Sequence, residues 1–76
     1  MKEILEYIAR HLVDDPEAVR VTEVRAERSI VLQLSAAQED MGKLIGKGGR
    51  TARAIRSVMR AAGTKNGQST VVEIVG

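Results

Sequence analysis

The sequence predicts a single α+β domain in which three strands form a sheet and the helices pack on one face of it. Apolar residues recur at helical spacing in the first dozen residues and again after residue 50, which indicates amphipathic helices. Three shorter runs rich in Val, Ile and Leu indicate strands. Because the chain has 76 residues, it has room for one domain, residues 1–76, with a modest core. The expected order is helix, strand, strand, helix, helix, strand.

The first half of the chain predicts one helix followed by a β-hairpin. The helix is expected over residues 3–13, and its apolar face consists of Ile4, Leu5, Ile8 and Leu12. Strands are expected over 19–25 and 30–35, and the short connection between them favours antiparallel pairing. The spacing between Val21 and Val24 breaks strict alternation, which predicts a bulge in the first strand.

The second half predicts two helices around a glycine-rich segment and then a last strand. A short helix is expected over 38–45 and a longer one over 50–62, with Gly63 as the glycine that follows the C-terminus of the longer helix. A turn over 64–67 then leads into a strand over 69–75. The side chains expected to be buried on the longer helix are Ala52, Ile55, Val58, Met59 and Ala62.

Composition excludes several kinds of chemistry and of binding. Tyr7 is the only Phe, Tyr or Trp residue, so stacking of bases on these rings is excluded as the main binding mode. The absence of cysteine excludes disulfides, a thiolate nucleophile and a zinc knuckle. The sequence offers no nucleophile–base pair, metal-ligand set or nucleotide-hydrolysis loop. We therefore expect no enzymatic activity, no catalytic residue, no metal and no cofactor.

Charge is distributed unevenly along the chain. Residues 1–40 carry five Lys and Arg against nine Asp and Glu, whereas residues 41–76 carry seven against one. The net charge of +2 therefore conceals a strongly basic second half. A localised positive field attracts polyanions, so the asymmetry favours nucleic acid as the partner.

The N-terminal stretch and the hydropathy pattern indicate where in the cell the protein is expected. No apolar run approaches the roughly 18 residues of a spanning helix. The first helix carries Glu3 and Glu6 within its apolar stretch, which does not fit a signal peptide. We therefore expect no membrane association and a cytoplasmic location.

Residues 42–56 combine a glycine-rich turn with the basic start of a helix. Spacing excludes a P-loop, since only three residues follow Gly42 before the Gly-Lys pair and neither Ser nor Thr comes next. Spacing also excludes a dinucleotide-binding fingerprint, which needs glycine where Thr51 stands. The motif that fits is a Gly-x-x-Gly turn between two helices, residues 46–49, which is the clamp that KH modules close on about four nucleotides.

Residues 41–51, MGKLIGKGGRT, resemble the centre of a bacterial type II KH domain, and the expected element order agrees with that fold. Together with the opening ILEYIARHLVDDPEAVRV, they make the whole chain similar to the small KhpA (YlqC) RNA-binding proteins. The resemblance implies binding of single-stranded RNA with low sequence specificity. It also implies a homodimer, or a heterodimer with a larger KH protein, KhpB (also called Jag or EloR). The implied role is that of an RNA chaperone or post-transcriptional regulator linked to cell division and envelope growth.

The residue types of the turn suit contact with phosphate. We expect the main-chain N–H groups of Lys47, Gly48 and Gly49 to face phosphate oxygens at the positive end of the following helix. Lys47 and Arg50 then add charge-assisted contacts from the tip of the turn and the first helical turn. The glycines allow positive φ and a close approach of the main chain to a ligand.

Residues outside the turn extend the expected site. Arg53, Arg56 and Arg60 recur on one side of the helix, and Arg53 is favoured over Arg60 because it lies nearer the turn. Lys43 could approach the nucleic acid from the preceding helix, and Ile45 with the second strand would line a shallow groove for bases. The expected RNA-binding residues are Lys43, Ile45, Gly46, Lys47, Gly48, Gly49, Arg50, Thr51 and Arg53.

Two other functions fit the same residues. The chain could be a protein–protein adaptor whose apolar surface docks a partner and whose basic turn is incidental. It could also bind single-stranded DNA, because the clamp contacts phosphates that both polymers share. Sequence alone leaves these alternatives open.

Overall fold

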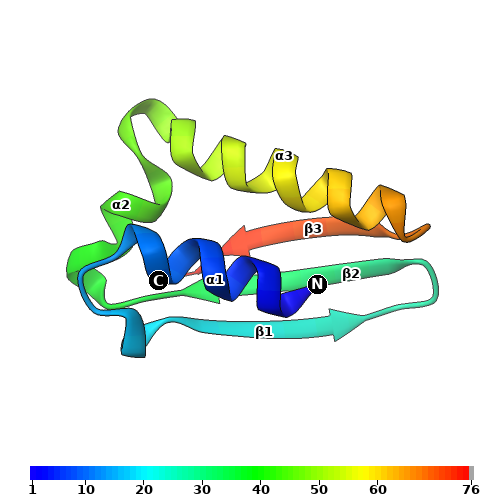
Figure 1. Ribbon diagram of the computed structural model, residues 1–76, viewed down its shortest axis with the longest axis horizontal. Coiled ribbons are helices and arrows are strands. Elements are labelled where there is room, and N and C mark those ends of the chain that lie inside the picture. Colours follow the sequence, from blue (N-terminus) through cyan, green and yellow to red (C-terminus); the bar gives the residue numbers. More distant parts are fainter. Residues whose placement is uncertain (76) are drawn as a thin grey trace.

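The computed structural model describes residues 1–75 and confirms the predicted order of elements (Figure 1). The helices and strands are α1 Lys2–Leu12, β1 Arg20–Arg25, β2 Ser29–Ser35, α2 Met41–Ile45, α3 Arg50–Lys65 and β3 Ser69–Ile74. Short 3₁₀ turns lie in three connections, at Pro16–Ala18, Gln38–Asp40 and Lys47–Gly49. Within the described range, none of the helices has the length and apolarity needed to cross a membrane.

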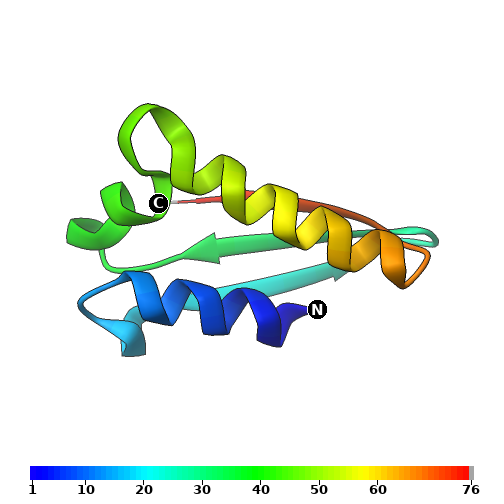
Figure 2. The same ribbon diagram turned by 45° about the horizontal axis from the view of Figure 1, so that its top comes forward.

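The strands form one mixed sheet in the order β1-β2-β3. β1 pairs antiparallel with β2 and β3 pairs parallel with β2, so β2 is the central strand and β3 is an edge strand. The helices lie on one face of the sheet, with α1 packed on β1 and α3 packed along β3 (Figures 1 and 2). This element order and this sheet are those of a type II KH fold, which confirms the predicted fold class.

The core lies between the helices and the covered face of the sheet. Alternate residues of β2, namely Ile30, Leu32 and Leu34, are fully buried, whereas the residues between them are partly exposed. Burial of each such side chain contributes about 1.5–3 kcal/mol relative to leaving it in water. The helices complete the core with Leu5, Ala9, Leu44, Ile55 and Met59. The domain therefore relies on aliphatic packing without aromatic residues.

The buried face of α3 differs in part from the predicted one. Ala52, Ile55 and Met59 are buried as expected, but Val58 is half exposed, so its assignment to the core was wrong. The buried positions follow one another at spacings of three and four residues, and Val58 lies about 100° around the helix from Met59. Its side chain consequently faces away from the sheet.

The predicted bulge in the first strand is absent. β1 pairs with β2 without interruption, and Val24 lies directly opposite Val31. Val21 is buried on the covered face, whereas Val24 lies on the open face and is 52% exposed. The broken alternation of valines therefore reflects one valine on each face of the sheet and not an extra residue.

Gly63 does not follow the end of α3 as predicted, because the helix continues to Lys65. An added Cβ at Gly63 would lie 2.0 Å from Thr70 Oγ1 and 2.9 Å from the main-chain oxygen of Gln68. The glycine is therefore needed where the helix backbone approaches β3. The left-handed residue after the helix is Gly67, at φ 72°, whose N–H donates to Thr64 O.

Two other boundaries differ slightly from the predicted ones. The segment 38–45 is a 3₁₀ turn followed by the short α2 and not one helix. β3 ends at Ile74, although the N–H of Val75 still donates to Leu34 O at 2.8 Å. Differences of this size at element ends depend on local hydrogen bonds that the sequence pattern does not specify.

Asp40 joins the start of α2 to the connection that follows α1. The residue is 3% exposed, and its Oδ2 accepts a hydrogen bond from the N–H of Asp15 at 3.0 Å. Its Oδ1 lies 3.5 Å from the Nζ of Lys43. Burial by itself would raise the pKa of this carboxyl, but the N–H groups of Asp15 and Asp14 and the Lys43 ammonium outweigh it and lower the pKa. Asp40 is therefore held in its ionised form.

Replacing Gly63 by Ala should destabilise the domain by about 1–3 kcal/mol, because the methyl group displaces Thr70 or the main chain of Gln68. Gly42→Ala is the matched control, since Gly42 also lies in a helix but has open space around its Cβ position. This control should leave the free energy of unfolding unchanged or raise it by up to about 1 kcal/mol. Urea unfolding measures both, and equal stability of the two variants would contradict the close approach at Gly63.

Asp40→Asn should lower the melting temperature at neutral pH. A carboxyl whose pKa is lower in the folded state stabilises the fold above its ordinary pKa of 3.8, and this contribution is lost as pH falls through the folded value. The difference in melting temperature between wild type and variant should therefore be largest above about pH 5 and shrink below pH 3.8. Glu17→Gln, at an exposed carboxylate with no ion pair among residues 1–75, is the control. A difference that stayed constant with pH would contradict this role.

Candidate nucleic-acid interface

The glycine-rich turn at Gly46–Gly49 connects α2 to α3 at one end of the molecule. In Figures 1 and 2 it stands out from the rest of the fold, above the start of α3. Lys47 and Gly48 are exposed, and no other element covers them. The turn is therefore open to a ligand from outside.

The sharpness of the turn comes from three glycines with positive φ, Gly46, Gly48 and Gly49, which are under different constraints. Gly46 has φ 76°, and an added Cβ there would lie 2.3 Å from the Oγ1 of Thr51, so the chain crosses directly over the first turn of α3. Gly48 has φ 65° with open space at its Cβ position, so its requirement is conformational and not steric. Gly49 has φ 78° and also has open space at its Cβ position, and together the three residues allow α3 to begin at Arg50, immediately after the turn.

Two main-chain N–H groups of the turn remain available. Gly46 N–H donates to Gly42 O at 2.8 Å, and Gly49 N–H donates to Gly46 O at 3.1 Å. The N–H groups of Lys47 and Gly48 have no acceptor among residues 1–75. This differs from the expectation of three free donors, because the Gly49 N–H closes the turn itself. The two available donors lie at the positive end of the 16-residue α3.

Cationic side chains surround these donors. Lys47 is at the tip of the turn, Arg50 begins α3, and Arg53 donates from its guanidinium to the main-chain oxygen of Gly48 at 3.2 Å. The basic residues in this part of the chain that form no ion pair within residues 1–75 are Lys47, Arg50, Arg53, Arg56 and Arg60. Their positive charge is therefore not compensated by carboxylates of the domain.

Lys43 has a different environment from the other expected site residues. Its ammonium forms ion pairs with Asp14 and Asp40, near the N-terminal end of α2. The hydrogen bond that the Lys43 ammonium donates to the Asp14 carboxylate is the main cause that raises the Lys43 pKa above its ordinary value. The structure therefore directs the Lys43 charge toward the acidic corner after α1 and not toward the glycine turn.

A hollow of about 320 Å³ lies beside the turn, between α2, α3 and the end of β3. Its lining residues are Ile45, Gly48, Gly49, Ala52, Arg53, Arg56 and Ile74. An adjoining hollow of about 490 Å³ shares Ile45 and Ile74 and is otherwise lined by Ala36, Gln38 and Met41. The floor is therefore aliphatic, with arginine side chains at one border.

The strand that lines this floor is β3 and not the second strand, which corrects the sequence-based expectation. β2 is central in the sheet and buried, whereas β3 is the edge strand that packs against α3. Sequence reasoning therefore missed Ile74. A signal was present, because the short connection between α3 and the last strand requires these two elements to be neighbours.

The arrangement can hold an extended anionic chain. Two N–H donors, cationic side chains around them and an aliphatic floor suit a phosphate backbone with bases laid beside it. Within residues 1–75, no three His, Cys, Asp or Glu side chains come close enough together to hold a metal ion.

Comparison with known proteins gives consistent matches along the chain. A family model described as KhpA/KhpB, KH domain, matches residues 2–74. The proteins named RNA-binding protein KhpA from Clostridium acetobutylicum and Clostridium perfringens are each 56% identical over 75 residues, covering 99% of this chain and 100% of the relative. A protein of the same name from Caldanaerobacter subterraneus is 48% identical with the same coverage.

A solved structure supports the fold independently. A variant of Era from Aquifex aeolicus, crystallised with GDP.AlF4-, matches 96% of this chain and 28% of its own with a TM-score of 0.68. The sequence identity is 19%, so this likeness concerns the fold alone. The family model and the full-length relatives go further, and they show that this chain belongs to the KhpA/KhpB family of KH-domain proteins.

Proposed function

We propose that this chain binds single-stranded RNA through the turn at residues 46–49. The observation that carries the proposal is the pair of unused N–H groups, of Lys47 and Gly48, beside uncompensated cations at the start of α3. Relatives that match the chain along its length are named RNA-binding protein KhpA, which supports RNA as the polymer. The proposed activity is binding, without catalysis and without a cofactor.

In this mechanism the two N–H groups donate to the oxygens of one phosphate, and Lys47 and Arg50 add charge-assisted contacts. The RNA then follows the hollow beside the turn, where its bases lie against Ile45 and Ile74. Because aliphatic side chains do not distinguish base edges, sequence specificity is low. The proposed contact residues are Ile45, Gly46, Lys47, Gly48, Gly49, Arg50, Thr51 and Arg53, with Lys43 at the margin because of its ion pairs.

One such site makes few phosphate contacts, so binding is weak and salt-dependent. For single strands the logarithm of affinity falls with that of salt by about 0.7 per phosphate contact. A second site raises the effective affinity, and we propose that it comes from a second copy of this chain or from a KhpB (Jag or EloR)-like partner. In this role the protein acts in the cytoplasm as an RNA chaperone or post-transcriptional regulator linked to cell division and envelope growth.

An adaptor function is the second candidate, because the open face of the sheet carries an apolar row. Val24, Val31 and Val71 are opposite one another in adjacent strands, and Val24 and Val71 are about half exposed. Light scattering after size exclusion, with and without RNase, separates the two candidates. Assembly that survives RNase and is unaffected by changes in the turn would favour the adaptor. Competition between matched RNA and DNA oligomers distinguishes the two nucleic acids.

The double variant Lys47→Asp/Gly48→Asp should lower RNA affinity at least about a hundredfold, because it reverses one charge and adds another beside the free N–H groups. Gly48 has open space at its Cβ position, so circular dichroism should be unchanged and the melting temperature should fall by only a few degrees. Fluorescence anisotropy with a labelled oligouridylate measures the affinity.

The chain offers a matched control at the other end of α3. Lys65→Asp/Gly67→Asp makes the same changes at a lysine and at a glycine of φ 72° that also has open space at its Cβ position. This control should retain RNA affinity within a few-fold. If both double variants bind RNA equally well, the turn is not the binding site.

A further inference from the structure

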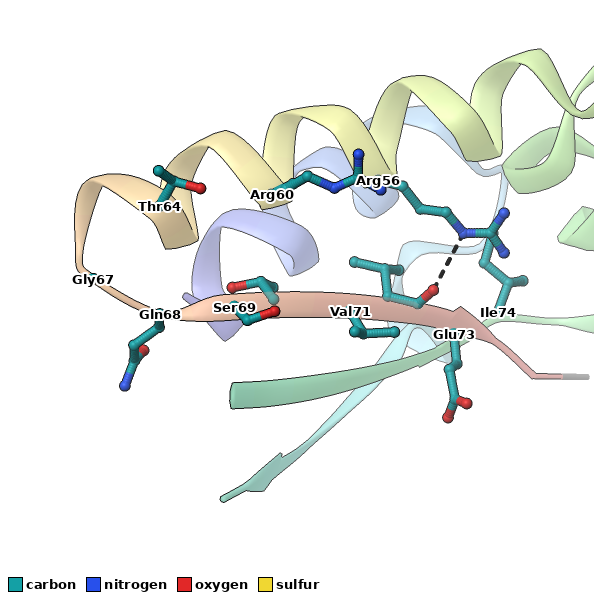
Figure 3. Close-up of a pocket in the computed structure, with 11 residues that line it drawn as sticks. Arg56, Arg60, Thr64, Gly67, Gln68, Ser69, Val71, Glu73 and Ile74 are labelled. Atoms are coloured by element: carbon teal, nitrogen blue, oxygen red, sulfur yellow. Dashed lines mark hydrogen bonds between the residues drawn. The ribbon is translucent and has the colours of Figure 1, made fainter. Parts of the chain in front are cut away.

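The glycine turn lies between one long helix and one very short helix. On its C-terminal side, α3 has 16 residues and is fixed to the sheet by Ile55 and Met59 in the core. Arg56 adds a contact to the main chain of β3, since its Nε donates to Val72 O at 3.2 Å, shown by the dashed line in Figure 3. On its N-terminal side, α2 has five residues. A helix of this length is not stable by itself, so its orientation depends on contacts outside it.

Two contacts fix α2 on the rest of the domain. Leu44 is fully buried in the core. One helical turn earlier, Asp40 immediately precedes α2 and is 3% exposed. At the other end of α2, the N–H of Gly46 donates to Gly42 O at 2.8 Å, so the turn continues directly from the helix. A rotation of α2 about Leu44 would therefore carry the turn with it.

The carboxylate of Asp40 does not cap α2, although an aspartate at this position commonly caps a helix. Instead, its Oδ2 accepts the N–H of Asp15, 25 residues earlier in the connection after α1. Its Oδ1 lies 3.5 Å from the Lys43 ammonium, which also donates to the exposed carboxylate of Asp14. The side chains of Asp14, Asp40 and Lys43 thus form an ion-pair cluster. Because a buried carboxylate is costly unless it is paired, this cluster favours one orientation of α2.

From these contacts we infer that the ion-pair cluster positions the glycine turn for RNA. By fixing the orientation of α2, the cluster directs the free N–H groups of Lys47 and Gly48 toward one phosphate. Asp40 is buried and does not contact the RNA, so it is a positioning residue. Lys43 acts through its ion pairs and α2, and not through a phosphate contact. This inference rests on the proposed RNA-binding function.

Charge and position predict opposite effects of Asp40→Asn on RNA affinity. Removal of a negative charge from the domain strengthens the binding of a polyanion if the electric field alone matters. Asparagine, however, replaces one carboxylate oxygen by an NH₂ group, which meets either the Lys43 ammonium or the N–H of Asp15 and breaks the cluster. The variant should therefore bind an oligouridylate of about four nucleotides several-fold more weakly than wild type, as measured by fluorescence anisotropy.

Two controls separate positioning from charge and from stability. Glu39→Gln makes the same change of charge at the preceding exposed residue, which forms no ion pair within residues 1–75, and should bind at least as tightly as wild type. Gly63→Ala destabilises the domain at the far end of α3, where Figure 3 shows Thr64 and Gly67 near the start of β3. At a temperature where all variants are folded, Gly63→Ala should bind like wild type.

Salt dependence shows how Lys43 acts. A lost phosphate contact makes the dependence of affinity on salt shallower by about 0.7, which is the change expected for Lys47→Gln. Lys43→Gln should weaken binding several-fold and leave this slope unchanged, because it breaks the cluster without removing a phosphate contact. A slope shallower by about 0.7 for Lys43→Gln would show that Lys43 contacts phosphate, and would overturn its assigned role.

Hydrogen exchange without RNA gives a readout that a uniform loss of stability does not reproduce. The amides of Gly46 and Gly49, which are bonded to Gly42 O and Gly46 O, should exchange faster in Asp40→Asn than in wild type. They should not exchange faster in Gly63→Ala. Unchanged exchange at these two amides, undiminished RNA affinity of Asp40→Asn, or an equal loss of affinity in Gly63→Ala would each overturn the positioning role.

The outcomes distinguish this inference from the proposed function. If Lys47→Asp/Gly48→Asp abolishes binding of the oligomer and Asp40→Asn leaves it intact, the turn binds RNA without the help of the cluster, and this inference alone fails. If the oligomer binds equally well to that double variant, the proposed function itself is wrong.

Discussion

The packing of α3 on the sheet is the constraint on which the rest of the structure depends. Ile55 and Met59 bury one face of the helix in the core, and the missing Cβ of Gly63 allows the helix to approach β3 closely at its far end. A helix fixed along its length has a fixed N-terminus. The glycine turn can therefore be exposed without being poorly positioned, because Gly46 lies directly over Thr51 in the first turn of that helix.

Charge is segregated around this helix in a way that follows from the fold. Carboxylates of the first half of the chain are held near the start of α2, where Asp14 and Asp40 pair with Lys43. The cations of α3 and of the turn have no such partners within residues 1–75. Lys43 is thus neutralised, whereas the basic residues of α3 and of the turn remain available to bind an anion. The net charge of the whole chain, +2, does not reveal this separation.

Local sequence patterns predicted the helices, the strands and the turn. The predictions that were wrong concern residues whose roles depend on contacts with residues far away in the sequence. Helical spacing and β-rich runs gave the correct element order, and the Gly-x-x-Gly spacing located the exposed turn at residues 46–49. The role of Gly63 depends on Thr70 across the helix–strand contact, and the ion pairs of Lys43 depend on Asp14, 29 residues away. The strand that lines the hollow beside the turn was misassigned, because the order of strands in a sheet is not encoded in the pattern of any one strand.

The most direct test of the account is a titration of the ¹⁵N-labelled protein with an oligouridylate of about four nucleotides, followed by NMR. Hydrogen bonds from Lys47 and Gly48 to phosphate should shift their two amide signals more than any others. The amide of Gly49, already bonded to Gly46 O, should move less. If the largest shifts fell instead on Val24, Val31 and Val71 of the open sheet face while the turn signals stayed unchanged, the claim that main-chain donors of the turn hold the RNA would be contradicted.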